Sequence, residues 1–428
     1  MIETEKDARK TVERALLVGI NDSSRTAEES MLHLDELAEL AGNLGIATVG
    51  KIIVNLKKPH AKYYVGTGKA EEIAEELKAL DADCLIFDDE MYPAQQRNWE
   101  RLTEILVIDR QEIILDIFVK RATTREATLQ VELARLEYYL PRLTKAWSHL
   151  SRQGGGGFNK GEGEQQIELD RRLIRNRIAA LKSELEVVQT QRDTQRKNRK
   201  NNNIPMAAIV GYTNAGKSSL LNKLCDSKVY IANKLFATLD PTTRKYTLPN
   251  RQELILTDTV GFVRKLPHAL VEAFKSTLEE AVLADFLLLI LDISSPVVKE
   301  QWETTLEVLK ELGADSKRII TVFNKIDLEE DPEHVEWIRG LFPDAVFISA
   351  ATGEGLNELT QRMESYCSDW NTIIRVKLPP ARHDLAAYSH RNGDVLESEY
   401  DENGNLFMTV RIDKQGAREF SEYLQTNH

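Results

Sequence analysis

Apolar and polar positions along the chain change period several times, and each change predicts a different kind of structure. Between about residues 15 and 120, short apolar runs such as RALLVGI (14–20) and DCLIFDDE (83–90) alternate with helical patterns such as residues 26–45. Strand-like and helical segments in alternation are typical of an α/β domain. We therefore predict an N-terminal α/β domain over residues 1–121.

Two helical patterns with matching heptad spacing follow, and they predict an antiparallel hairpin of long helices over residues 122–204. The spacing steps by four and three through two sets of apolar residues: Leu129, Leu133, Leu136, Leu140 and Leu143, then Ile174, Ile178, Leu181, Leu185 and Val188. Four glycines, Gly154 to Gly157, lie between the two sets and are expected at or near the tip of the hairpin. Pro141 should kink the first helix.

The rest of the chain predicts two further domains. Strands and helices alternate again over residues 205–370, as in another α/β domain. Residues 371–428 read as a small α+β module with a β-hairpin around Asn403 and Gly404. The fold class is therefore α/β multidomain, with a helical hairpin ahead of the third domain and a small module after it.

Composition favours a protein of the cytoplasm that does not insert into membranes. Hydrophobic residues make up 42% and charged residues 29% of the chain, and no apolar run reaches the roughly 18 residues of a membrane span. The first residues, MIETEKDARK, lack the pattern of a secretory signal. Cys84, Cys225 and Cys367 show no paired spacing, so we expect reduced thiols and no zinc site.

The charge of the chain is unevenly distributed. The formal net charge is −12, yet residues 142–200 carry 14 lysines and arginines against 7 acidic residues. This basic region includes the glycine run, with Arg152, Lys160, Arg171 and Arg172 around it. The pattern favours a tip that contacts RNA phosphates, and the alternative is a solvated linker of no functional consequence.

The segment GYTNAGKS (211–218) has the spacing GxxxxGK[ST], directly after an apolar strand and before an amphipathic helix. In such a P-loop, backbone N–H groups from Gly211, Tyr212, Thr213, Asn214, Ala215 and Gly216 surround phosphate oxygens. Lys217 is expected to reach the β- and γ-phosphates, and Ser218 to bind Mg²⁺. Residues 205–370 are therefore predicted to form a P-loop domain.

Three further segments, each after an apolar strand, predict that the nucleotide is GTP. DTVG (258–261) places Asp258 to bind Mg²⁺ through water and the N–H of Gly261 to bind the γ-phosphate, with Thr259 and Val260 beside them. NKID (324–327) supplies Asn324, Lys325, Ile326 and Asp327, and the Asp327 carboxylate accepts two hydrogen bonds from guanine. Ser349, Ala350 and Ala351 suit a loop packed against the guanine oxygen, so hydrolysis of GTP is the predicted reaction.

The loop that closes over the γ-phosphate lies within NKLFATLDPTTRKYTL (233–248), where Thr238, Thr242 and Thr243 are all chemically suited to bind Mg²⁺. Many GTPases orient the attacking water with a glutamine directly after DxxG, and Phe262 occupies that position here. We therefore expect slow hydrolysis without a partner or a bound cation. The carbonyl of Asn214 is one candidate ligand for K⁺, and the alternative is a surface asparagine that stabilises the loop.

A weaker signal is YYVGTGKAEEI (63–73), which contains Gly66, Gly68 and Lys69 without P-loop spacing. A turn between a strand and a helix is the favoured interpretation, and a second nucleotide site is the alternative.

The order of these elements, with GYTNAGKS, LFATLDPTTR, DTVGFVRKLPHALVEAFKSTLEE, NKID and SAATGEGL, resembles the HflX family of ribosome-associated GTPases over nearly the whole chain. The resemblance implies binding to the large ribosomal subunit and its RNA in the GTP state, with the glycine loop directed toward the peptidyl-transferase centre and dissociation of stalled or idle ribosomes. It selects Thr238 as the switch threonine. The segment around it that is expected to contact GTP consists of Phe236, Ala237, Thr238, Leu239 and Asp240. It also implies ATP binding by the N-terminal domain, for which Gly66, Gly68 and Lys69 are the nearest candidates.

The chain departs from the family pattern at the loop. FNKGEGE (158–164) stands where the family reads close to RGPGE, with Lys160 in place of arginine and Glu162 in place of proline. A less basic and less rigid loop leaves two roles open, ribosome dissociation and antibiotic protection.

The rival hypothesis from another class is a nucleotide-stabilised interaction module whose hairpin binds proteins. We expect a monomer with Lys217, Thr238 and Gly261 as the residues that act on the γ-phosphate.

Overall fold

The computed structural model describes residues 12–21, 26–143, 162–200, 204–225, 236, 241–250, 252–265, 280–368, 371–413 and 416–425. Contacts between residues divide the chain into two compact units. The first unit holds residues 1–192 together with the segments 230–240 and 260–278, and the second holds the remainder. The segments 230–240 and 260–278, which the sequence analysis places within the P-loop domain of residues 205–370, therefore group with the N-terminal part of the chain.

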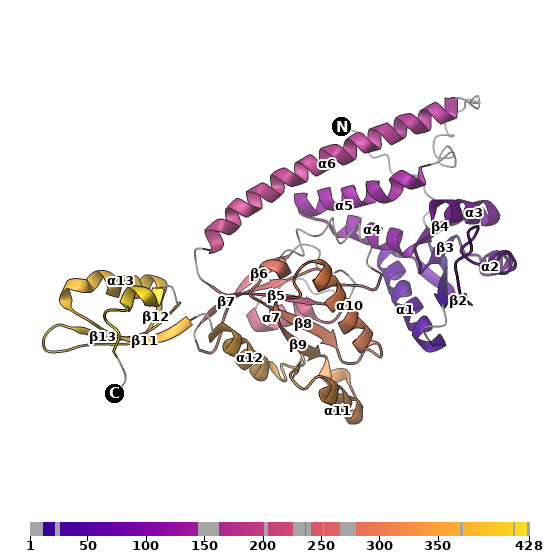
Figure 1. The fold of residues 1–428 in the computed structure, drawn as a ribbon. Coiled ribbons are helices and arrows are strands. Elements are labelled where there is room, and N and C mark those ends of the chain that lie inside the picture. The colour runs from indigo at the N-terminus through magenta and orange to yellow at the C-terminus, as the bar shows by residue number, and fades with distance from the viewer. Residues whose placement is uncertain are drawn as a thin grey trace. The chain divides into compact units, whose positions relative to one another are not determined.

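The first unit is built on a parallel sheet with the strand order β2-β1-β3-β4 (Figure 1). Its strands are β1 (Arg14–Asn21), β2 (Ala47–Asn55), β3 (Cys84–Phe87) and β4 (Leu106–Asp109), and its helices are α1 (Ala27–Leu44), α2 (Thr67–Ala79), α3 (Pro93–Thr103) and α4 (Arg110–Arg121). Residues Ala15 to Val18 of the interior strand β1 are fully buried, which explains its unbroken apolar run.

Side-chain caps set where the helices of this unit begin. Thr26 and Glu29 form a capping box at the start of α1, and Gly45 ends that helix in the left-handed region with φ 88°. Asp109 is both the last residue of β4 and the N-cap of α4, where its carboxylate accepts a hydrogen bond from the N–H of Glu112. The chain therefore passes from strand to helix without a loop at this edge of the sheet.

The hairpin region forms α5 (Arg125–Tyr139), a 3₁₀ turn η1 (Leu140–Arg142) and α6 (Glu162–Lys200). Apolar residues from both helices pack together, and they are Leu129, Leu133, Leu136, Ile178, Leu181, Leu185 and Val188. Arg125, at the start of α5, pairs with Glu184, whereas Glu132, further along α5, pairs with Arg177, which comes earlier on α6. The two helices are therefore antiparallel (Figure 1).

Pro141 has a stronger effect on the first of these helices than the predicted kink. The α-helix ends at Tyr139, and Leu140 and Leu143 of the heptad pattern lie beyond it. Proline has no N–H for the helical hydrogen bond and restricts the residue before it, so the 3₁₀ turn replaces a further helical turn. Arg142 in this turn is buried and donates hydrogen bonds to the carbonyl oxygens of Tyr138 and Met91.

The second unit contains a six-stranded sheet with the order β10-β9-β8-β5-β7-β6, in which only β6 is antiparallel to its neighbour. The strands are β5 (Met206–Gly211), β6 (Thr242–Thr247), β7 (Glu253–Asp258), β8 (Phe286–Asp292), β9 (Arg318–Asn324) and β10 (Val346–Phe347), with helices α7 (Lys217–Cys225), α10 (Val298–Glu311), η3 (Ile326–Leu328), α11 (Pro332–Leu341) and α12 (Leu356–Ser368). Since β5, β7, β8 and β9 are parallel, their carboxyl ends meet at one edge, where ligands of open α/β sheets bind.

A three-stranded antiparallel sheet with the order β11-β13-β12 completes the second unit. Its elements are β11 (Asn371–Leu378), η4 (Pro380–Arg382), α13 (His383–Asn392), β12 (Asp394–Tyr400), β13 (Leu406–Asp413) and η5 (Gly416–Phe420). The turn between β12 and β13 contains Asn403 and Gly404, with Gly404 at φ 78°. No helix within the described ranges is long and apolar enough to cross a membrane.

Candidate nucleotide-binding site

The turn after β5 is shaped by two glycines that no other residue replaces without strain. Gly211 has φ 140°, and a Cβ there would lie 2.1 Å from the carbonyl oxygen of Ile290. Gly216 has φ 93°, and a Cβ there would lie 2.2 Å from Nδ2 of Asn324. The turn therefore packs directly on β8 and on the end of β9, and it leads into α7 with its backbone N–H groups available to an anion.

Lys217 is the first residue of α7 and lies beneath the turn. Its ammonium group donates hydrogen bonds to the carbonyl oxygens of Gly211 at 3.1 Å and Tyr212 at 2.7 Å. Burial lowers the pKa of Lys217 to about 8, and the negative charge of Asp258 opposes that shift. A buried cation held at this position gains most from a nearby polyanion, as expected for a phosphate-binding lysine.

Ser218 and Asp258 bring two oxygen ligands together. The hydroxyl of Ser218 donates to the carboxylate of Asp258 at 2.6 Å, and Asp258 is fully buried at the end of β7. Beside it, the hydroxyl of Thr259 donates to the carbonyl oxygen of Ile209 at 2.8 Å and so ties the ends of β7 and β5 together. Hydroxyl and carboxylate oxygens suit Mg²⁺, which takes few protein ligands and completes its shell with phosphates and water. The pair therefore fits a magnesium ion next to the phosphate turn.

Asn324 links the phosphate turn to the loop after β10. Its side chain is buried, donates to the carbonyl oxygen of Ala215 at 2.8 Å, and accepts from the N–H of Ala350 at 2.9 Å. Ser349, buried beside Ala350, accepts a hydrogen bond from the N–H of Thr352 at 3.0 Å. One asparagine thus fixes the relative position of two predicted nucleotide-binding loops.

Asp327 and Lys325 lie just beyond Asn324. Lys325 adopts φ 68°, and Ile326 and Asp327 begin the 3₁₀ turn η3, where the Asp327 side chain is exposed. The ammonium of Lys325 pairs with the carboxylate of Asp292 at 2.6 Å. Asp292 is not among the site residues predicted from the sequence. Its position as the last residue of the apolar strand β8, at the same edge of the sheet as Asn324, could have identified it.

The structure brings together the predicted residues of the second unit, from Gly211 to Ser218, Asp258 and Thr259, Asn324 to Asp327, and Ser349 to Ala351. Ala237, Thr238, Leu239 and Asp240 lie outside the described residues, so their predicted roles stay predictions. Phe236, Val260 and Gly261 group with the first unit. Phe236 is buried, and its ring packs edge-on against Phe118 of α4 with centroids 4.6 Å apart.

The predicted RNA-binding tip is described in part. Arg152, Gly154, Gly155, Gly156, Gly157 and Lys160 lie outside the described residues. Arg171 and Arg172 both lie on α6, where Arg171 donates to the carbonyl oxygen of Leu143 at 2.9 Å and Arg172 is exposed. Of the N-terminal candidates, Gly66 is the N-cap of α2 and Lys69 pairs with Glu72 in the first turn of that helix.

Comparison with known proteins finds matches over most of the chain. Family models match residues 31–119 (GTP-binding GTPase N-terminal), 121–199 (GTP-binding GTPase Middle Region), 206–325 (50S ribosome-binding GTPase) and 342–427 (HflX C-terminal domain). The chain is 50% identical to GTPase HflX of Akkermansia muciniphila over 421 residues, which covers 95% of each chain. It is 42% identical to GTPase HflX of Escherichia coli over 401 residues, which covers 94% of this chain and 93% of the relative.

The chain belongs to the HflX family of GTPases. The resemblance read from the motifs is therefore confirmed, and so is the predicted hydrolysis of GTP. Among solved structures, the complex of SsGBP with GDP is 26% identical, with a TM-score of 0.46 and coverage of 83% of this chain and 98% of that chain.

Replacing Asp327 with asparagine should change the base preference of this HflX-family protein. The amide removes one acceptor for the guanine N–H groups and offers a donor in its place, so we expect GTP affinity to fall about 10- to 100-fold, which corresponds to about 1 to 3 kcal/mol. Xanthosine triphosphate, which has a carbonyl where guanine has an amino group, should bind the variant better than GTP. Equilibrium titration with both nucleotides checks this, and unchanged GTP affinity would contradict the assignment of Asp327.

Proposed function

We propose that this chain binds the large ribosomal subunit in its GTP state, dissociates stalled or idle ribosomes, and is reset by hydrolysis of GTP. The observation that carries the proposal is the match of residues 206–325, which hold the phosphate turn, Asp258 and Asn324, to a family described as 50S ribosome-binding GTPase. A protein with this cycle works in the cytoplasm as a monomer. An antibiotic-protection role on the same ribosomal surface is the nearest alternative, because the loop at 158–164 departs from the family pattern.

The proposed cycle assigns a role to each predicted residue of the site. Lys217 would neutralise charge on the β- and γ-phosphates, and Ser218, Asp258 and Thr238 are the residues that would hold Mg²⁺, which would neutralise further phosphate charge. The N–H of Gly261 would be a donor to the γ-phosphate, and the carbonyl of Asn214 would be a ligand for K⁺, which would add positive charge. Phe262 is 1% exposed and apolar, so it offers no hydrogen bond to orient water, which supports slow hydrolysis until the ribosome contributes.

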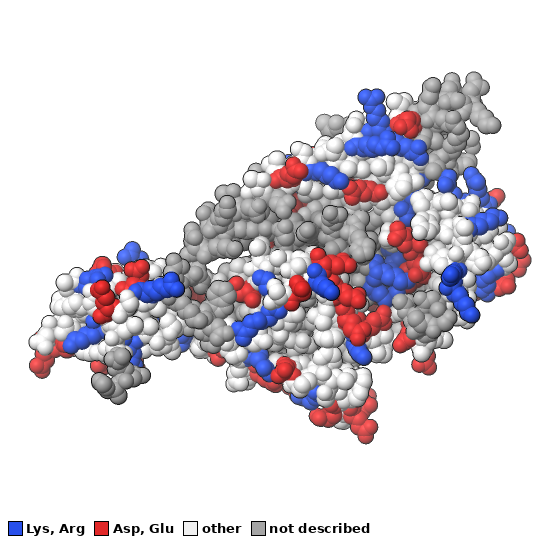
Figure 2. Space-filling view, in the orientation of Figure 1, with Lys and Arg blue, Asp and Glu red and all other residues white. Residues whose placement is uncertain are grey.

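The charges of α6 bear on where RNA is contacted. Arg177 pairs with Glu132 at 2.8 Å and Lys182 pairs with Glu137 at 2.9 Å. Figure 2 shows basic and acidic side chains together on the described part of α6. Since these cations are already matched by carboxylates, we place the main RNA contacts at Arg152, Lys160 and Arg172 around the glycine loop.

The apolar seams of the hairpin argue against the rival interaction module. Leu129, Leu133 and Leu181 are buried against each other within this chain. A coiled-coil contact with a protein partner needs a free apolar seam, and this seam is already covered.

Co-sedimentation with large ribosomal subunits tests the proposal. We expect retention with a non-hydrolysable GTP analogue and not with GDP, a steep loss at high salt, and a loss of about 10-fold or more when residues 154–157 are deleted. A variant with four serines in place of Gly154 to Gly157 serves as the matched control, because it keeps the loop length. Equal retention with both nucleotides, or none with either, would reject the proposal in favour of a module that binds proteins.

A further inference from the structure

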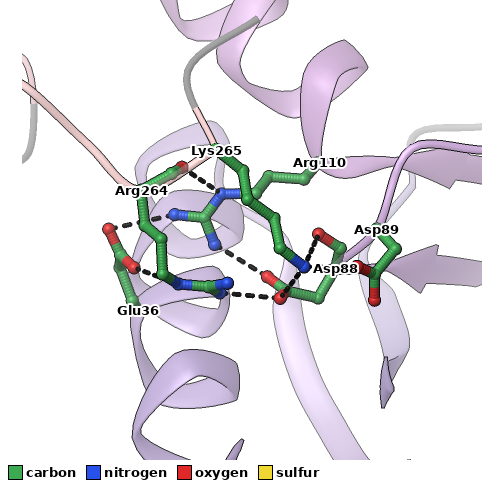
Figure 3. Close-up of polar contacts among 6 residues, drawn as sticks. All are labelled: Glu36, Asp88, Asp89, Arg110, Arg264 and Lys265. Atoms are coloured by element: carbon green, nitrogen blue, oxygen red, sulfur yellow. Dashed lines mark hydrogen bonds and ion pairs between the residues drawn. The ribbon is translucent and has the colours of Figure 1, made fainter. Parts of the chain in front are cut away.

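A cluster of charged side chains holds the chain that follows Gly261. It consists of Glu36 on α1, Asp88 and Asp89 after β3, Arg110 at the start of α4, and Arg264 and Lys265 (Figure 3). Arg264 and Lys265 follow Gly261 by three and four residues, and all members of the cluster belong to the first unit. None of them has a role in the nucleotide chemistry described above.

Asp88 is the centre of the cluster. Its carboxylate accepts hydrogen bonds from Arg110 at 2.7 Å and from Arg264 at 2.6 Å. Lys265 donates to the same carboxylate at 3.1 Å and also pairs with Asp89. The backbone after Gly261 is held as well, because Nε of Arg110 donates to the carbonyl oxygen of Arg264 at 3.0 Å.

Glu36 closes the cluster on its other side. It lies 2.9 Å from Arg110 and 3.6 Å from Arg264, and Figure 3 shows both guanidinium groups between the carboxylates of Glu36 and Asp88. Three acidic and three basic side chains are thus matched.

Burial makes these interactions strong and specific. Asp88 is 3% exposed, Arg110 1% and Arg264 5%. Burial by itself raises the pKa of Asp88, but the charges of Arg110, Arg264 and Lys265 outweigh it and hold that pKa well below its ordinary value. Asp88 is therefore ionised across the physiological range, and solvent and salt screen the pairs little.

The segment between Gly261 and the cluster is buried and specifically placed. Phe262 and Val263 are 1% and 0% exposed. Lys265 has φ 53°, a left-handed conformation that is unfavourable for a residue with a Cβ and persists because the surrounding contacts hold it. The same helix α4 that supplies Arg110 also supplies Phe118, which packs on Phe236 of the other segment next to the predicted switch threonine.

We propose that Asp88 is a positioning residue for γ-phosphate recognition: with Arg110 it anchors Arg264 and Lys265, and so restricts the backbone conformations open to Gly261, the residue proposed to contact the γ-phosphate. A free segment would lose conformational entropy on ordering around the γ-phosphate, whereas an anchored segment has already lost it. GDP has no γ-phosphate and gains nothing from this anchoring. The inference rests on the γ-phosphate contact proposed for Gly261 and is independent of the ribosome.

Affinities of the full chain for GDPNP, a non-hydrolysable GTP analogue, and for GDP test the proposal. Asp88→Asn should weaken GDPNP binding by about 10-fold and change GDP binding by less than about 2-fold. Lys265→Gln should also weaken GDPNP binding selectively, by about 3-fold. Lys265→Arg should bind GDPNP as the parent protein does, because the charge is kept. The double variant Asp88→Asn/Lys265→Gln should lose little more GDPNP affinity than Asp88→Asn alone, since the two residues act through one contact.

The matched control is Lys51→Gln. Lys51 is also a lysine of the first unit in an ion pair, with Asp35, and its side chain is 26% exposed against 29% for Lys265. It has no link to the segment after Gly261, so neither nucleotide should bind differently.

Three outcomes separate the explanations. Equal loss of GDPNP and GDP affinity in Asp88→Asn and Lys265→Gln, with a lower melting temperature, would overturn the proposal in favour of a purely stabilising cluster. A selective gain in GDPNP affinity would also overturn it, because the cluster would then oppose the GTP state. A separate variant, Gly261→Pro, removes the N–H that the underlying contact uses: if it leaves the preference for GDPNP over GDP unchanged, the contact at Gly261 is rejected independently of Asp88.

Discussion

Replacing Lys217 with glutamine is expected to lower kcat/KM for GTP by about 10³-fold, the largest loss from any single side chain of the site. The ammonium group is buried under the phosphate turn, where its charge acts on the transferring phosphoryl group with little screening. Glutamine keeps a polar group that can donate hydrogen bonds, but it carries no charge and is one bond shorter. The fold should survive, because the turn is shaped by Gly211 and Gly216 and not by the lysine.

Single-turnover GTP hydrolysis, with and without ribosomes, measures this loss. Lys245→Gln is the matched control, since Lys245 lies on β6 of the second unit, is exposed, and pairs with Glu253 away from the predicted nucleotide-binding loops. We expect that control to stay within about 2-fold of the parent protein. If Lys217→Gln retained a tenth or more of the parent kcat/KM, Lys217 would not be the phosphate-binding lysine.

Replacing Asn324 with alanine should weaken both GTP and GDP by about 100-fold and destabilise the second unit. The side chain is 2% exposed and satisfies the carbonyl oxygen of Ala215 and the N–H of Ala350. Alanine would leave both groups buried without their partner, at a cost of about 1 to 3 kcal/mol for each. The phosphate turn and the loop after β10 would also lose their direct connection.

Isothermal titration with GDP and GTP, together with thermal unfolding, checks this prediction. Because both loops are affected, the two affinities should fall together, in contrast to the selective loss expected for Asp88→Asn. Asn357→Ala, an exposed position at the start of α12, is the control and should change neither quantity. A selective loss of GTP alone would show that Asn324 acts on the γ-phosphate side and not as a link between the loops.

The amino-acid sequence by itself determined the family and the chemistry of this protein. The P-loop, DTVG, NKID and SAA segments each follow an apolar strand, and parallel strands bring their carboxyl ends to one edge of a sheet. Local spacing was therefore enough to select Lys217, Ser218, Asp258 and Asn324 as neighbours. The heptad pattern likewise identified the residues of α5 and α6 that pack together, although it extended the first helix past Tyr139.

Only the tertiary structure decided which partners distant residues take. Arg264 and Lys265 read as ordinary charges after DTVG, and Asp88 as a polar residue after a strand, yet they meet across more than 170 positions of sequence. Asn324 was chosen for its motif, but its bonds to Ala215 and Ala350 depend on where two other loops lie. Periodicity and short motifs are properties of neighbouring residues, so they predict elements and local chemistry. The pairing of buried charges depends on how those elements pack, because burial and the distance between partners arise only when the chain is folded.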